Sequence, residues 1–82
     1  MYKYRVIACR TDESRMLLEG GAGLYHWARA LNSLPPVGKS LIGGRPHLGF
    51  GLLLCSRPAA TFRVMFESVN SDDRDLDPRF IP

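Results

Sequence analysis

The stretch from Gly20 to Pro36 constrains the fold more strongly than any other part of this sequence. Its apolar residues recur at spacings of three and four, which places them on one face of a helix. They are Leu24, Trp27, Ala28, Leu31 and Leu34. Pro35 and Pro36 end the pattern, because proline has no N–H to donate and disfavours helical geometry in the preceding residue. The spacing therefore predicts one helix over residues 22–34.

The rest of the chain predicts strands on both sides of this helix. Alternating apolar and polar residues predict a first strand over residues 2–9 and a last one over residues 61–69. A leucine-rich run predicts another strand over residues 48–55, and residues 40–42 fit a short strand within the loop that follows the helix. Residues 15–19 fit either a hairpin partner of the first strand or the start of a longer helix. The hairpin is favoured, because each of the two glycines that follow would cost a helix about 1 kcal/mol.

These elements predict an α+β fold, a small antiparallel sheet of ββαββ order with the helix packed on one face. At 82 residues the chain is long enough for one domain, which we place at residues 1–69, followed by an acidic C-terminal tail over residues 70–82. The expected core joins the apolar side of the helix to the apolar sides of the strands. It comprises Val6, Ala8, Leu17, Leu24, Trp27, Leu31, Phe50, Leu52, Phe62, Val64 and Phe66.

The opposite side of the predicted sheet is also apolar, which is unusual for a sheet face in contact with water. Strand alternation places four residues there: Ile7, Cys9, Leu53 and Met65. A contiguous apolar patch of this kind marks a contact surface. Either the C-terminal Phe80 and Ile81 fold back over it, or a second copy of the chain covers it. A homodimer through this face is favoured, because symmetric pairing is the commonest association of small soluble proteins.

The net charge of +3 conceals two regions of opposite sign. Residues 1–66 hold nine Lys or Arg against three acidic residues, whereas residues 67–82 hold two Arg against five acidic residues. Nine of the eleven bases are arginine, which suits planar contacts with carboxylate or phosphate groups. Neither a signal peptide nor an apolar run long enough to span a bilayer is found, so a cytoplasmic protein without a membrane partner is expected. The two cysteines are expected to be reduced, since distant cysteines in such a compartment are mostly small buried hydrophobes.

Fragments of known motifs are present, but each lacks a residue that its chemistry requires. Residues 37–40 match the end of a phosphate-binding loop, but Ser33 stands where that motif needs glycine. Asp73, Asp75 and Asp77 alternate as in a calcium loop, but Pro78 occupies the obligatory glycine position. The two histidines and two cysteines lack the paired spacing of a zinc site. The sequence therefore predicts no catalytic, cofactor-binding or metal-binding residue, and a protein that is not an enzyme.

The remaining candidates are surface residues that suit contacts with other macromolecules. Tyr25, His26 and Arg29 fall on the exposed side of the predicted helix, and Tyr and Arg are enriched at protein–protein hot spots. A face that meets only solvent is the alternative for these three. Tyr2 and Arg5 belong to a strand in which aromatic and basic residues alternate, which also suits base stacking and phosphate contact.

These observations predict a non-enzymatic module that binds another protein. In size and build the chain resembles small phage-encoded inhibitor proteins, and the resemblance implies an inhibitor of a host complex, of the anti-defence or anti-CRISPR kind. A small nucleic-acid-binding protein that uses the arginine-rich surface is the alternative. Because the acidic tail cancels half of the charge of residues 1–66, only weak nucleic-acid contact is expected of the full chain.

Overall fold

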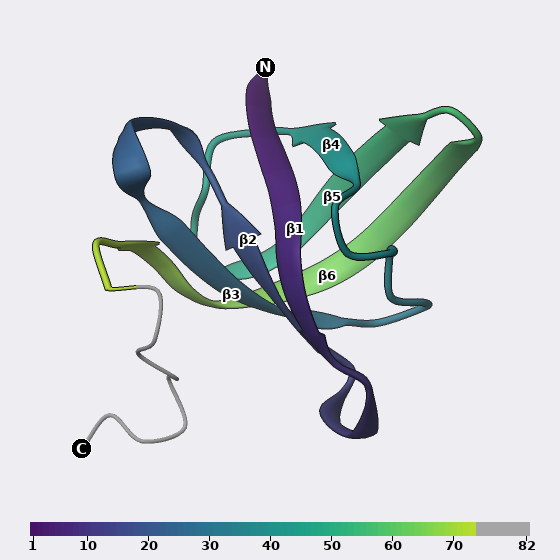
Figure 1. Ribbon diagram of the computed structural model, residues 1–82, viewed down its shortest axis with the longest axis horizontal. Helices are drawn as coiled ribbons and strands as arrows, with labels where there is room; N and C mark the ends of the chain where they lie inside the picture. The colour runs from purple at the N-terminus through teal and green to yellow at the C-terminus, as the bar shows by residue number, and fades with distance from the viewer. Residues whose placement is uncertain (74–82) are drawn as a thin grey trace.

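The computed structural model describes residues 1–73, which form a closed antiparallel barrel of six strands (Figure 1). The strands are β1 (Tyr2–Arg10), β2 (Arg15–Glu19), β3 (Tyr25–Ala30), β4 (Ser40–Gly43), β5 (Gly49–Ser56) and β6 (Ala59–Ser71). Their order around the barrel is β1-β2-β3-β6-β5-β4, and β1 pairs with β4 to close it. The green β5–β6 hairpin extends to the right-hand end of the molecule in Figure 1.

The prediction of an α+β fold with a packed helix is wrong, because residues 22–34 form the end of a turn, then β3, then a loop. Ala22 and Gly23 have φ angles of 59° and 69°, in the left-handed region that a right-handed helix excludes. The Gly20 N–H donates to the Leu24 carbonyl at 2.8 Å and closes this turn. β3 then pairs with β2 on one side and β6 on the other. These two ladders outweigh the helical spacing of the sequence, since tertiary pairing routinely overrides local propensity.

The strand predictions are confirmed at the level of individual elements. Residues 2–9 lie in β1, residues 48–55 correspond to β5, residues 61–69 lie within β6, and residues 40–42 lie in β4. The hairpin between the first strand and residues 15–19 is also present, with Arg10 opposite Arg15 next to the connecting turn. The remaining strand is β3, which was not predicted because its residues lie within the helical spacing.

The core fills the inside of the barrel. Inward-facing side chains from all six strands form one cluster: Tyr4, Val6, Met16, Leu18, Ala28, Leu41, Leu53, Cys55, Phe62, Val64 and Phe66. Leu17 and Trp27 are buried as predicted, but they alternate with core residues and lie opposite each other on the outer side of β2 and β3. Leu31, which was expected in the core, is exposed in the loop after β3.

The two faces of β5 are reversed relative to the prediction. Phe50 and Leu52 are 51% and 48% exposed, whereas Leu53 is 1% exposed and belongs to the core. Gly51 explains the reversal, because a Cβ atom there would lie 2.8 Å from Cε2 of Phe66. The Phe66 ring therefore occupies the space that an inward side chain at Gly51 would need, so the face of β5 with the smaller residues points into the barrel.

Cys9 and Cys55 form no disulfide with each other. Among the described residues there is no helix with the length and apolar character needed to cross a membrane. β6 ends at Ser71, and residues 74–82 lie outside the described part of the chain. The predicted cover by Phe80 and Ile81, and most of the predicted acidic tail, fall in those residues.

Candidate functional site

The three residues predicted on one helix face are divided between two sides of β3. Tyr25 and Arg29 point outward, whereas His26 points into the barrel and is 1% exposed. Neighbouring residues of a strand face opposite sides, so His26 cannot share a surface with Tyr25. The predicted patch of Tyr25, His26 and Arg29 is therefore not present as a single surface.

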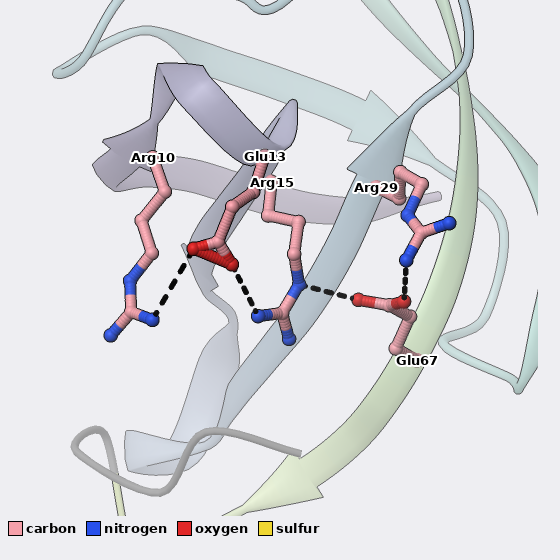
Figure 2. Close-up of polar contacts among 5 residues, drawn as sticks. All are labelled: Arg10, Glu13, Arg15, Arg29 and Glu67. Atoms are coloured by element: carbon pink, nitrogen blue, oxygen red, sulfur yellow. Dashed lines mark hydrogen bonds and ion pairs between the residues drawn. The ribbon is translucent and has the colours of Figure 1, made fainter. Parts of the chain in front are cut away.

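Arg29 is one end of a row of charges on the outer side of β2, β3 and β6 (Figure 2). Its Nη2 lies 3.1 Å from Oε2 of Glu67, whose Oε1 accepts a hydrogen bond from Nε of Arg15 at 2.7 Å. Arg15 continues the row to Glu13 at 3.4 Å, and Arg10 follows at 3.9 Å from Glu13. Because Arg29 is engaged within this row, it is positioned by the fold as well as exposed to solvent.

Arg15 and Trp27 form the buried centre of the same outer surface. The Arg15 side chain is 1% exposed, and its guanidinium carbon lies 5.1 Å from the centre of the Trp27 ring. The guanidinium carbon of Arg10 lies 5.2 Å from the same ring. This stacking of cations on an indole face is favourable because the ring quadrupole attracts positive charge. It explains how a large aromatic side chain is buried outside the barrel.

Tyr2 and Arg5 lie at different places on β1. Tyr2 is exposed at the end of the barrel where β1 begins, and it lines a cleft there. Arg5 pairs with Glu19 of β2 at 3.0 Å, with both side chains accessible to solvent. Glu19 lies opposite Arg5 in one ladder and opposite Tyr25 in the next, so Arg5 and Tyr25 are separated on the outer side only by Glu19. Tyr2 lies apart from them at the end of the barrel.

The four residues predicted to form the dimer face do not share a surface. Ile7 and Cys9 are partly buried on β1, Leu53 lies in the core, and only Met65 is clearly exposed, at 38%. Cys9 packs against the core, and its Sγ donates to the Pro35 carbonyl at 3.5 Å. The reversed faces of β5 account for the misplacement of Leu53, so the homodimer face built on these four residues is not present.

The outer side of β4, β5 and β6 instead carries a contiguous apolar surface, which we call the apolar face. It consists of Ile42, Phe50, Leu52, Leu54 and Met65. Phe50 lies directly opposite Met65 in the β5–β6 ladder, and Ile42 lies opposite Leu54 in the β4–β5 ladder. Leu52 connects the two pairs along β5. Directly opposite residues on one face of a sheet are in side-chain contact range, so these five residues form one patch.

Two basic residues adjoin the apolar face, because Lys3 lies opposite Ile42 and Arg63 lies opposite Leu52. Residues 20–66, which include β4 and β5 and most of β6, contain five Lys or Arg and no Asp or Glu. Arg63 is exposed directly opposite Leu52, next to the patch. Arg63 therefore places positive charge at the edge of the patch beside Leu52, whereas Glu67 follows Met65 by two positions on the outer side of β6.

Sequence reasoning missed this face because β5 is apolar on both sides. Its leucines occupy successive positions, so alternation alone cannot decide which set is buried. The available signal is the pair Gly49 and Gly51, which stands on the opposite side from Phe50 and Leu52. Glycine in a strand marks close approach of a neighbouring group, and at Gly51 that group is the Phe66 ring.

Comparison with protein-family models, with curated proteins and with solved structures gave no match for this chain. The functional conclusion therefore rests on the surface chemistry of the barrel itself.

Proposed function

We propose that this chain is a non-enzymatic module that binds another protein through the apolar face. The observation that carries the proposal is the exposure of Phe50, Leu52 and Met65 side by side on the outside of a barrel that already has a complete core. A contiguous exposed apolar patch next to charged residues is typical of an interaction site. Phe and Met are also enriched in the centres of protein–protein interfaces.

The energy available from this face is sufficient to drive an association. Full burial of a Phe, Leu or Met side chain yields about 1.5–3 kcal/mol, and these side chains are already half buried in the isolated chain. Each of them therefore has about 1 kcal/mol still to gain. Five such residues in one patch match the few well-packed residues that dominate a typical interface.

The charge around the face indicates the chemistry of the partner. Isologous pairing of two copies would bring Arg63 and its basic surroundings toward the same groups of the second copy. Like charges facing each other across an interface oppose association. The proposed partner therefore presents an apolar surface bordered by Asp or Glu residues.

The same features decide between protein and nucleic acid as the partner. Of the five residues of the apolar face only Phe50 is aromatic. Protein surfaces that bind single-stranded nucleic acid combine basic residues with several aromatic rings on which the nucleobases stack. The aliphatic side chains of the patch have no counterpart on a phosphate backbone. A protein is therefore the proposed partner, and the experiment below also tests for nucleic acid.

Two narrower parts of the proposal concern mode of action and compartment. A small barrel with one binding face acts most simply by occupying a surface of a larger assembly, as an inhibitor of a host complex of the phage-encoded type would. The two free thiols suit a reducing compartment, so the cytoplasm is the proposed location.

The experiment compares three baits in affinity capture from the cells in which the chain naturally acts. The baits are the wild-type chain, Leu52→Glu on the apolar face, and Val37→Glu in the exposed loop between β3 and β4. We expect the wild type and Val37→Glu to retain the same protein, and Leu52→Glu to lose it. Arg63→Glu is expected to weaken retention as well, because it reverses the charge that faces the acidic border of the partner.

Far-UV circular dichroism of each bait shows whether it is folded, so that loss of the partner is not confused with unfolding. Equal retention by Leu52→Glu and the wild type contradicts the proposal. It is also contradicted if nuclease treatment removes all retained material, which identifies nucleic acid as the ligand, or if the only retained protein is a second copy of this chain.

A further inference from the structure

A cleft of about 410 Å³ opens at the end of the barrel where β1 begins. Its walls come from the start of β1, the turn between β2 and β3, and the loop that precedes β5. Tyr2, Lys3, Gly20, His26 and Arg45 are among its lining residues, and none of the lining residues belongs to the apolar face. Small-molecule sites have volumes of about 300–1,000 Å³, so the cleft is large enough for a compact ligand.

His26 is the buried polar group of this cleft, and its ring is fixed by its neighbours. The ring lies edge-on to Tyr4 at a centroid distance of 5.5 Å and to Phe66 at 6.4 Å. Its Nδ1 accepts a hydrogen bond from the backbone N–H of Asn70 at 3.0 Å. Burial lowers the pKa of His26 below its usual value, so the ring is neutral at pH 7. Since Nδ1 is the acceptor, the proton of the neutral ring resides on Nε2.

The Nε2–H of His26 is available as a donor toward the cleft. Within residues 1–73 it makes no hydrogen bond, although the side chain is almost completely buried. A Cβ atom at Gly20 would lie 2.6 Å from Nε2, so the His26 ring packs directly against Gly20 and no larger residue fits beside this donor. Buried polar groups in folded proteins nearly always have a partner, and one that faces a cleft indicates a ligand atom or water.

The rim of the cleft is positively charged. Lys3 and Arg45 both line it, and neither forms an ion pair within the described part of the chain. Among residues 1–73, no Asp or Glu lines the cleft. Tyr2 adds an exposed aromatic ring at the same rim. The cleft thus combines a fixed neutral donor at its base with two cations and an aromatic surface at its opening.

We propose that this cleft binds a nucleoside monophosphate, a small anion with a planar heteroaromatic ring. An acceptor atom of the base receives the hydrogen bond from Nε2–H of His26, while the base lies against Tyr2. The phosphate is held by Lys3 and Arg45, which line the cleft without a neighbouring carboxylate from residues 1–73. Such a ligand would contact the His26 donor, the Tyr2 ring and both cations. The proposal does not depend on the protein partner of the apolar face.

The test is a titration of the full chain, labelled with ¹⁵N-histidine, with AMP, UMP, adenosine and inorganic phosphate. Calorimetry gives the dissociation constant, and NMR reports the chemical shift of Nε2 of His26. We expect at least one monophosphate to bind saturably and to shift this nitrogen. Adenosine and inorganic phosphate are expected to bind about tenfold more weakly or worse, because each supplies only part of the contacts.

Variants locate the binding within the cleft. Lys3→Gln and Arg45→Gln are surface substitutions and are expected to weaken monophosphate binding about tenfold each. Gly20→Ala is expected to abolish the Nε2 shift, because the added Cβ atom would collide with the His26 ring and displace it. Arg57→Gln, in the turn between β5 and β6, removes an exposed cation elsewhere and is the control that leaves binding unchanged.

Three results would overturn the proposal. The first is the absence of saturable binding by both monophosphates. The second is evidence of attraction by net charge alone. Inorganic phosphate would then bind as tightly as the monophosphates, or Arg57→Gln would weaken monophosphate binding as much as Lys3→Gln and Arg45→Gln do. The third is binding without a change at Nε2 of His26, which places the ligand elsewhere.

Discussion

Arg15 shows how a single charged residue can be central to this fold. Its guanidinium is buried, stacks on Trp27 and donates to Glu67, which lies 52 positions further along the chain. The burial of Trp27 could be predicted from its size and apolar character. The burial of Arg15 could not, because its main partner is distant in sequence and no local pattern announces such a pair.

The ion pair of Arg15 and Glu67 predicts an asymmetry between two carboxylate substitutions. Glu67→Ala removes an oxygen 2.7 Å from a buried guanidinium and is expected to lower the free energy of unfolding by about 3 kcal/mol. Glu19→Ala removes the partner of Arg5, a solvent-accessible pair, and is expected to cost less than about 1 kcal/mol. Chemical denaturation of the two variants measures both values. Equal decreases in the free energy of unfolding of the two variants would mean that Glu67 is not needed to compensate the buried charge of Arg15.

At the scale of elements, five of the six strands could be predicted from alternation and turn residues, and β3 could not. Its six residues, Tyr25–Ala30, fit the helical spacing but show no strand alternation, since His26, Trp27 and Ala28 are buried in succession. Their strand conformation is determined by contacts outside the segment, namely the ladders to β2 and β6 and the left-handed turn before β3. For β5 the apolar character of both sides hid the apolar face in the same way, and only the ring of Phe66 settles the orientation.

The turn before β3 offers a test that separates the strand from the helix. Gly23 has a φ of +69°, so Gly23→Ala is expected to lower the free energy of unfolding by about 1 kcal/mol. In a helix the same change would raise it by a similar amount, because alanine is the better helix former. Gly21→Ala is the matched control, since Gly21 has no positive φ and open space around its Cβ position. It is expected to be neutral or slightly stabilising in chemical denaturation. A Gly23→Ala variant more stable than the wild type contradicts the described turn.

At the scale of the whole molecule, closure of the barrel determines how it can meet a partner. The pairing of β1 with β4 leaves no open edge among the strands of the described residues, so association by adding a strand is not available. Contacts must use the outer faces, and on β4, β5 and β6 that face is apolar. Closure joins residues about 40 positions apart, as in the pairing of Tyr2 with Gly43, and the sequence carries no local signal of it.

The isolated chain presents Leu52 and Met65 to solvent and keeps Leu53 inside the barrel. The most direct measurement is the relaxation that a soluble paramagnetic probe induces in the methyl resonances of the full chain at high protein concentration. We expect strong relaxation at Leu52 and Met65 and protection at Leu53 and Leu41, which belong to the core. Protection of Leu52 and Met65 would contradict this expectation by showing that the face is already covered, and strong relaxation at Leu53 would contradict the orientation of β5.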